Sequence, residues 1–371
     1  MVALPPSQHT TAAAVLRWRA AQPQEHRAHL GASVLGHACD RHIWYLFRNA
    51  QASEFEGRML RLFDRGKREE ATVYQELRGI GVELHADEHG KQIDCRDASG
   101  HIGGSVDGVG RGFPEAPKSW AVLEIKTHSS KSFKILAAKG VCEAKPAHYA
   151  QMQIYMGLMQ LPRALYFGVN KDTDELHTEW VHFERGSFDA LMERGHRLVD
   201  AKEPPQRLSE DPAYWTCKGC QHYNVCHQEH VPEANCRTCC HATPVENGAW
   251  SCGLHNKQLD RAEQLAGCAQ HLFIPALIPY AQATDAGDGY VEYQHQNGEA
   301  FRNGAGGFGS RELVGPSKEL IVDTTLKTLR AFFDAKVVAT DTVPAKRGRR
   351  SRVDLSNVPE FKDDDLADIR F

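Results

Sequence analysis

Apolar and polar positions repeat with two different periods along the chain, and the change of period predicts an α/β protein. Apolar residues recur at helical spacing over residues 33–48, where Ser33 is the expected N-cap, and over 55–77, where a helix begins or breaks near Gly66. Beyond Gly79 the period falls to two, as it does in strands separated by turn residues. The strands predicted in this stretch cover residues 81–86, 91–95, 103–110 and 120–126.

Helical and strand patterns then follow each other. They predict helices over 147–161 and 185–201 and a pair of strands over 164–170 and 177–183. This order fits an α/β core in which helices flank a mixed sheet. Farther along, Asn297-Gly298 is a typical hairpin turn between strands at 289–294 and 299–302, and a short helix is expected over 326–335.

Shifts of pattern and composition divide the chain into five predicted parts. A lead-in (1–30) precedes the α/β core (31–230). A cysteine-rich segment (231–274), a small α+β region (275–340) and a flexible charged tail (341–371) follow it. The lead-in contains one short helical stretch.

Composition is that of a globular protein. Of the 371 residues, 41% are hydrophobic and 25% are charged, which is enough apolar surface for a core. The formal net charge of −4 neither supports nor excludes a nucleic-acid partner. No apolar run reaches the ~18 residues of a membrane span, and the start lacks the pattern of a secretion signal. We therefore expect a cytoplasmic protein without membrane contact.

The eleven cysteines are unevenly placed, since eight of them lie between Cys217 and Cys268. Disulfides are typical of small secreted chains, whereas clustered cysteines in a cytosolic chain of this size more often bind metal. The clustering therefore predicts metal sites.

Two carboxylates and a lysine form a candidate catalytic set. Asp107 follows a Gly-Gly-Ser-Val run, and Glu124 and Lys126 are separated by Ile125. Because side chains alternate along a strand, Glu124 and Lys126 should share one face while Ile125 enters the core. Two carboxylates can bind Mg²⁺ or Mn²⁺, the metal can activate a water, and the lysine can orient that water or stabilise negative charge. A charged, exposed strand face is the ordinary alternative.

Two further motifs flank this set. Gly66-Lys67-Arg68-Glu69-Glu70 lies on the predicted helix before the sheet, and Gln151 and Tyr155 lie four residues apart on the helix after it. In this order the motifs resemble the RecB-like branch of the PD-(D/E)xK nucleases.

The resemblance implies a role for each matching residue. Glu70, Asp107 and Glu124 would bind the metal, Lys126 would hold the water, and Gln151 and Tyr155 would lie beside the substrate. Val106 stands where the family motif has proline. Glu70 stands where some members have histidine, which could alter the metal preference, and Glu69 is the neighbouring alternative.

The first cysteine set adds a second point of resemblance. Cys217, Cys220 and Cys226 follow the core, and Cys39 precedes it. Three clustered cysteines could also form part of a zinc site. One early and three late cysteines, however, are similar to those of RecB-like nucleases related to the CRISPR-adaptation exonuclease, in which four thiolates hold a [4Fe–4S] cluster. The resemblance covers about residues 31–228 and implies a structural cluster that joins both ends of the core.

The second cysteine set has spacing typical of zinc. Cys236, Cys239 and Cys252 are the firmer ligands, and Cys268 is the preferred fourth, with His255 and His271 as alternatives. Four protein ligands would make this zinc structural. A linker with reduced thiols is the other interpretation.

The sequence thus predicts an α/β protein with a restriction-endonuclease-like core, an iron–sulfur staple, a small zinc-binding module and a C-terminal α+β extension. The expected function is a Mg²⁺- or Mn²⁺-dependent DNA nuclease, an exonuclease in repair, recombination or phage DNA processing. Single strands or DNA ends are the expected substrates. Lys131, Lys134 and Lys145 are expected to contact the DNA backbone. A recombination or helicase protein is the expected protein partner. The alternative is a catalytically silent DNA-binding or scaffold protein on the same fold. No Walker A loop is present, so we expect no intrinsic ATP-driven unwinding.

Overall fold

A computed structural model describes residues 10–22, 28–51, 55–86 and 93–314, together with Thr328 and Phe332. The charged tail lies outside the described residues, as does the predicted helix 326–335 apart from those two positions. Within the described part, no helix combines the length and the apolar character that crossing a membrane requires.

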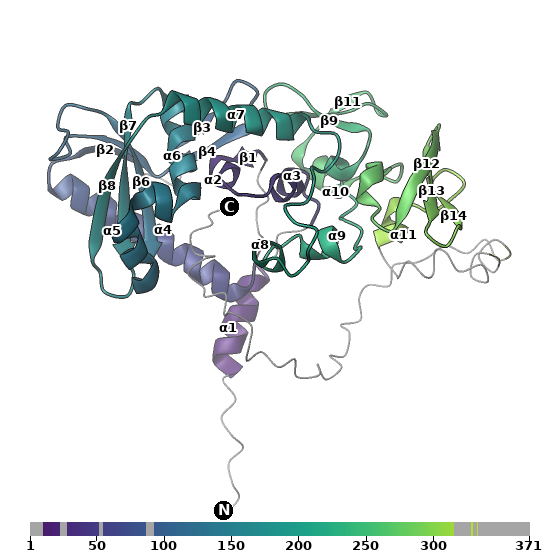
Figure 1. The fold of residues 1–371 in the computed structure, drawn as a ribbon, viewed down its shortest axis with the longest axis horizontal. Helices are drawn as coiled ribbons and strands as arrows, with labels where there is room; N and C mark the ends of the chain where they lie inside the picture. Colours follow the sequence, from purple (N-terminus) through teal and green to yellow (C-terminus); the bar gives the residue numbers. More distant parts are fainter. Residues whose placement is uncertain are drawn as a thin grey trace, which may run out of the picture.

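A five-stranded mixed sheet forms the centre of the core (Figure 1). Its order is β2-β5-β6-β7-β8, and only β6 and β7 run parallel, while the other neighbours are antiparallel. A parallel pair needs a long crossover, and two helices, α5 and α6, provide it here. The strands are β2 (Glu83–Ala86), β5 (Gly108–Arg111), β6 (Ala121–His128), β7 (Arg163–Asn170) and β8 (Leu176–His182).

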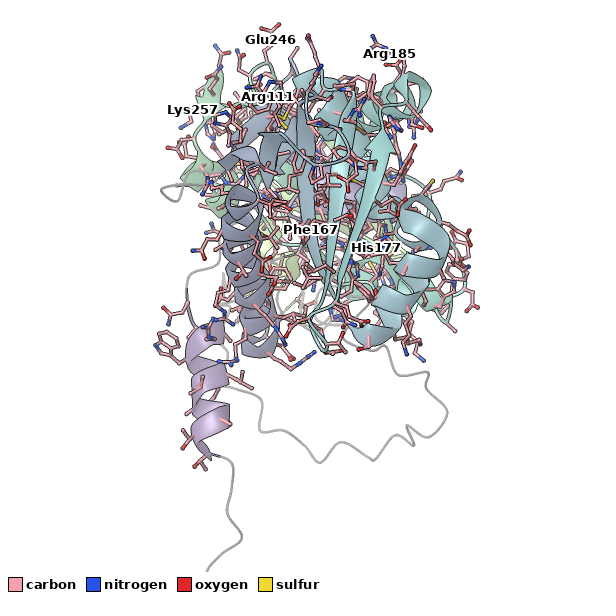
Figure 2. All side chains as sticks on the ribbon, turned by 90° about the vertical axis from the view of Figure 1, so that its left-hand side faces the viewer. Arg111, Phe167, His177, Arg185, Glu246 and Lys257 are labelled. Carbon is pink, nitrogen blue, oxygen red and sulfur yellow. The ribbon has the colours of Figure 1, made fainter. Side chains whose placement is uncertain are left out.

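Helices cover both faces of this sheet, as Figure 2 shows from the side of β7 and β8, near the labels Phe167 and His177. On one face, α4 (Gly57–Gly79) packs Val73 and Leu77 against Leu123 and Ile125 of β6. The other face lies under α5 (Ser130–Ala144) and α6 (Pro146–Met159). The sequence prediction of a mixed sheet flanked by helices is confirmed, and Ile125 is buried as expected.

A three-stranded sheet of order β1-β4-β3 lies beside the main one and comprises β1 (Leu30–Gly31), β3 (Ile93–Arg96) and β4 (Ile102–Val106). The single strand predicted over 103–110 was wrong, because β4 and β5 belong to different sheets and meet at Asp107. The Asp107 carbonyl accepts a hydrogen bond from the Tyr74 hydroxyl of α4 at 2.6 Å.

The predicted helix 33–48 is also divided. It forms α2 (Ala32–Leu35) and α3 (Asp40–Phe47), and the N-cap of α3 is Cys39, whose sulfur accepts from the His42 backbone N–H at 3.4 Å. Ser33 lies inside α2 instead of capping it. By contrast, α4 is continuous through Gly66. The sequence analysis missed α5, whose N-cap is Ser129.

Helix α7 (Arg185–Asp200) follows β8 as predicted and leads to the cysteine-rich part. That part contains α8 (Trp215–Lys218), α9 (Tyr223–His227), the 3-10 helix η1 (Cys236–Thr238), a sheet of order β11-β10-β9, and α10 (Arg261–Ala266). The strands are β9 (Ala242–Pro244), β10 (Trp250–Cys252) and β11 (Lys257–Leu259).

A last antiparallel sheet follows the 3-10 helix η2 (Pro275–Leu277) and precedes α11 (Ser310–Val314). It contains β12 (Ala281–Gly287), β13 (Tyr290–His295) and β14 (Ala300–Gly304). The predicted hairpin is present between β13 and β14, and Gly298 in its turn has a φ of 87°. Before the core, α1 (Thr10–Ala20) packs along α4 (Figure 1).

Candidate active site and cysteine centres

Asp107, Glu124 and Lys126 meet where β4 passes into β5 beside β6. The backbone N–H of Ile125 donates to Asp107 Oδ2 at 2.8 Å, which holds this carboxylate against β6. Lys126 Nζ forms an ion pair with Glu124 and lies 3.6 Å from Asp107 Oδ2. The strand alternation therefore places one ammonium group between two carboxylates, as the sequence predicted for Glu124 and Lys126.

These three side chains are almost completely buried, and Glu124 is 0% exposed. Burial, with a further contribution from the Asp107 charge, raises the pKa of Glu124 to about 8, although the Lys126 ammonium opposes the shift. Among the described residues, Glu124 Oε2 is a buried oxygen without a hydrogen-bond partner. A buried carboxylate oxygen left in this state fits a metal ligand, because a cation would supply the missing interaction.

Gln151 and Tyr155 lie one turn apart on α6, above the same face. The Tyr155 hydroxyl donates to the Ser105 carbonyl at 2.9 Å and accepts from Gln151 Nε2 at 3.3 Å. Tyr155 approaches β4 so closely that a Cβ atom on Gly104 would lie 2.6 Å from the phenol oxygen. Burial first, and then the nearby Glu124, raises the pKa of Tyr155, so its hydroxyl stays a neutral hydrogen-bonding group.

Glu70 lies on α4, the helix that covers the opposite face of the sheet. It is buried on α4 one turn before Tyr74, whose hydroxyl donates to the Asp107 carbonyl. Positions four apart share a helix face, so Glu70 and Tyr74 both face the β4–β5 junction. Glu69 is half-buried. Lys131 and Lys134 are exposed on α5, and Lys145, between α5 and α6, is half-buried.

Sequence reasoning missed a polar network that continues the row of Glu124 and Lys126 along β6. His128 is the next residue on the same face after Lys126, and its Nε2 lies 2.9 Å from the Tyr166 hydroxyl. His148 of α6 contacts that hydroxyl at 2.7 Å. Burial, followed by the charges of Lys145 and Lys126, lowers the pKa of His128 to about 3, so this histidine is neutral. The position of His128 two residues after Lys126 was the available signal.

The first cysteine set lies together although its members come from opposite ends of the core. Cys39, Cys217, Cys220 and Cys226 line one cavity, and none of the eleven cysteines forms a disulfide. Cys39 caps α3, Cys217 lies on α8, and Cys226 lies on α9. This grouping of thiols is suited to holding a metal centre.

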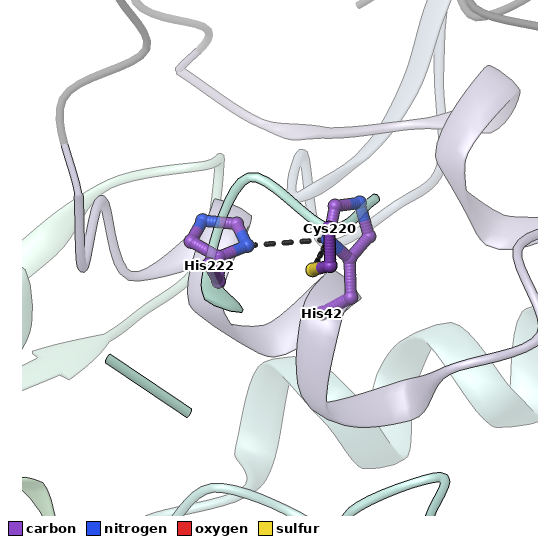
Figure 3. Close-up of side chains that lie close together, drawn as sticks. All are labelled: His42, Cys220 and His222. Atoms are coloured by element: carbon purple, nitrogen blue, oxygen red, sulfur yellow. Dashed lines mark hydrogen bonds between the residues drawn. The ribbon is translucent and has the colours of Figure 1, made fainter. Parts of the chain in front are cut away.

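Four histidines that the sequence analysis overlooked also line this cavity, and Figure 3 shows two of them, His42 and His222. His42 Nδ1 lies 3.3 Å from the Cys220 sulfur and 3.2 Å from His222 Nδ1. Within the described ranges, His42, Cys220 and His222 are the three possible metal-binding side chains whose ligand atoms lie within 4.8 Å of one another. The positions of His42 and His222, three residues after Cys39 and two after Cys220, were the signal that could have revealed these two.

Arg194 of α7 holds the backbone that presents Cys39. Its guanidinium donates to the carbonyls of Leu35 and His37 at 2.6 and 2.7 Å and to Asp40 Oδ1 at 2.7 Å. These contacts explain why the chain leaves the helical path between α2 and α3.

The second cysteine set gathers around a different cavity. Cys236, Cys239, Cys252 and Cys268 all line it, and so do His255 and His271, the two alternative ligands. The cavity therefore brings the predicted ligands together and leaves the choice of the fourth among Cys268, His255 and His271.

Comparison with known proteins gives only remote similarities. No family model matches the sequence, and no curated protein matches it significantly. The fold is similar to that of SSO0001 at 16% identity, over 60% of this chain and 96% of that chain, with a TM-score of 0.36. It is also similar to LHK-Exo, an alkaline exonuclease from Laribacter hongkongensis, at 13% identity over 49% of this chain and 90% of that chain. The TM-score is 0.32 for this structure and 0.34 for LHK-Exo in complex with dAMP.

Proposed function

We propose that the protein is a metal-dependent DNA nuclease of the PD-(D/E)xK type. The convergence of Asp107 and Glu124 on Lys126 is the observation that carries this proposal. Burying charged groups is costly, and Glu124 Oε2 has no hydrogen-bond partner among the described residues even beside Lys126, so a ligand or a reaction would account for this arrangement. A buried carboxyl group whose pKa is raised, as that of Glu124 is, is typical of functional sites.

Each residue has a distinct role in this reaction. Asp107, Glu124 and Glu70 would hold Mg²⁺ or Mn²⁺, and this ion would supply a Lewis acid for the phosphate and lower the pKa of the attacking water. Lys126 would orient that water and stabilise the charge that develops on the phosphate oxygens. Tyr155, fixed by Ser105 and Gln151, positions the substrate strand.

The first cysteine set would hold a [4Fe–4S] cluster with a structural role. Four free thiols around one cavity fit the four thiolates that such a cluster needs. Ligands at positions 39 and 217–226 close a loop that contains nearly the whole core, and closing so long a loop stabilises the fold. The second set, for which the spacing predicts structural zinc, is a separate centre.

DNA would approach along the side of α5, where Lys131 and Lys134 are exposed on the helix that directly follows β6. Lysines that contact phosphates contribute affinity without sequence preference. Contacts without sequence preference fit an exonuclease that acts on single strands or DNA ends in repair, recombination or phage DNA processing. Its partner would be a recombination or helicase protein.

The direct test is cleavage of end-labelled single- and double-stranded DNA by anaerobically purified protein with Mn²⁺, Mg²⁺ or EDTA. We expect metal-dependent cleavage that Asp107→Ala and Lys126→Ala each reduce by at least 100-fold, because both remove parts of the reacting site. Lys118→Ala is the matched control, since Lys118 is exposed on the loop before β6. Full activity in Lys126→Ala protein would overturn the mechanism.

A second candidate function is DNA binding or scaffolding without cleavage. The observation that favours it is the burial of Asp107, Glu124 and Lys126, because a phosphate reaches them only if the residues covering them move. Metal-dependent DNA binding without cleavage, under every metal tested, would establish this second function.

A further inference from the structure

The second cysteine set combines three structural elements. Cys236 begins η1, Cys239 follows it, Cys252 ends β10, and Cys268 comes two residues after the end of α10. All four are free thiols that line a cavity of about 600 Å³. Four sulfurs around one space are the ligand set of either a zinc ion or an iron–sulfur cluster.

The two centres require different separations between the sulfurs. Zinc–sulfur bonds of about 2.3 Å in a tetrahedron bring all four sulfurs within about 3.8 Å of one another. In the described part of the chain, only His42, Cys220 and His222 bring three ligand atoms within 4.8 Å of one another. No three members of the second set are therefore as close as one zinc ion requires. A cluster places several irons between its thiolates and so holds them farther apart.

The backbone that carries the first two cysteines is held from outside the cavity. Asn235 forms a capping box with Thr238, and the Cys239 N–H donates to the Cys236 carbonyl at 3.1 Å. The backbone N–H of Cys240 donates to the Leu272 carbonyl at 2.9 Å. These bonds fix the backbone that presents Cys236 and Cys239 to the cavity.

Arg237, between these cysteines, attaches the whole segment to the core. It is buried, and it donates to the carbonyls of Phe47 and Ala28 at 2.9 and 2.7 Å and to Gln264 at 2.8 Å. Its guanidinium lies 4.8 Å from the ring of Trp250, two residues before Cys252.

The surroundings of the cavity also indicate a charged centre. His271 is 3% exposed and lines the cavity, and its Nδ1 has no hydrogen-bond partner within the described residues. Neighbouring buried thiolates repel one another unless cations lie between them.

The first cysteine set has the same properties. Its four thiols also line one cavity, and no three of its sulfurs lie within 4.8 Å of one another in the described part of the chain. The two sets lie at opposite ends of α3, because Cys39 caps the helix and Phe47, its last residue, accepts from Arg237.

We propose that Cys236, Cys239, Cys252 and Cys268 hold a second iron–sulfur cluster, in place of the zinc ion that their spacing predicts. The cluster has a structural role: it joins η1, β10 and α10 into one unit, and Arg237 docks that unit on the helix that carries Cys39. This assignment does not depend on nuclease activity.

The experiment counts iron, sulfide and zinc in the full chain after anaerobic purification from medium that contains both metals. The wild type is compared with a first-set variant, Cys217→Ser/Cys220→Ser, and a second-set variant, Cys252→Ser/Cys268→Ser. Cys142→Ser is the matched control, because Cys142 is exposed. We expect no bound zinc in the wild type, and we expect iron and sulfide in equal amounts to persist in the first-set variant and to fall in the second-set variant.

One zinc per wild-type chain that is lost in the second-set variant would overturn the proposal, and so would a first-set variant without iron. If a variant fails to fold, the iron and zinc content of the wild type alone tests the proposal. Iron for two clusters, about six to eight atoms per chain, supports the proposal. About four irons with or without one zinc overturns it. Because no DNA is present, failure here is distinguishable from failure of the proposed nuclease.

Discussion

Replacing Glu124 by glutamine should make the metal-free protein more stable while removing its function. The pKa of Glu124 is about 8 in the folded protein, against its ordinary value of 4.5, because the side chain is fully buried. A carboxyl whose pKa is raised on folding contributes its full stability below pH 4.5 and loses it as the pH rises toward 8. At about 1.4 kcal/mol for each unit of pKa, the loss is about 3 kcal/mol at pH 7 and about 5 kcal/mol above pH 8. Glutamine carries no charge and avoids this loss.

The assay is thermal unfolding in EDTA and in Mn²⁺, from pH 6 to pH 9. An increase of about 3 kcal/mol corresponds to a Tm increase of about 6–12 °C for a core of this size. We expect Glu124→Gln to raise the Tm in EDTA, increasingly with pH, and to abolish both the stabilisation by Mn²⁺ and DNA cleavage.

Glu76→Gln is the matched control, because Glu76 is exposed on α4 and should leave all three properties unchanged. A Glu124→Gln protein that is no more stable than the wild type in EDTA, or that Mn²⁺ still stabilises, would refute the reasoning.

Three further predictions follow from contacts around the two sites. Gly104→Ala places a Cβ atom 2.6 Å from the Tyr155 oxygen, so it should break the Tyr155 hydrogen bonds. We expect the free energy of unfolding to fall by about 1–3 kcal/mol and DNA cleavage to fall at least 10-fold. Unchanged cleavage kinetics would contradict the placement of Tyr155. Arg194→Ala removes the bonds that hold the loop before α3 and should lower iron content by more than half, whereas Arg185→Ala, which is exposed, should not. The pKa of His128 is lowered to about 3 on folding, so the stability that His128 contributes is present above pH 6.5 and is lost as the pH falls. Between pH 7 and pH 5, the free energy of unfolding of the wild type should fall by about 2 kcal/mol more than that of His128→Gln protein. Equal losses would contradict a neutral, buried His128.

Several features of the fold could be read from local pattern. A period of two was sufficient to place Glu124 and Lys126 on one face of β6 and to bury Ile125 on the other. The alternation of helical and strand patterns predicted α6, α7, β7 and β8 to within one or two residues. The errors occurred where tertiary contacts override local preference, as in the division of α2 from α3 by Arg194.

The sequence by itself supplied the candidate groups of this protein: two carboxylates and a lysine in a fixed order, a first set of four cysteines, a second set of three with Cys268, His255 or His271 as the fourth member, and the α/β pattern that carries them. Only the tertiary structure decided which of these groups meet. It placed Asp107 between two sheets, and it brought His42 against Cys220 and His222. The physical reason is that periodicity and propensity act over a few neighbouring residues. Contacts between distant residues, and the spacing of four sulfurs around a cavity, depend on how whole elements pack.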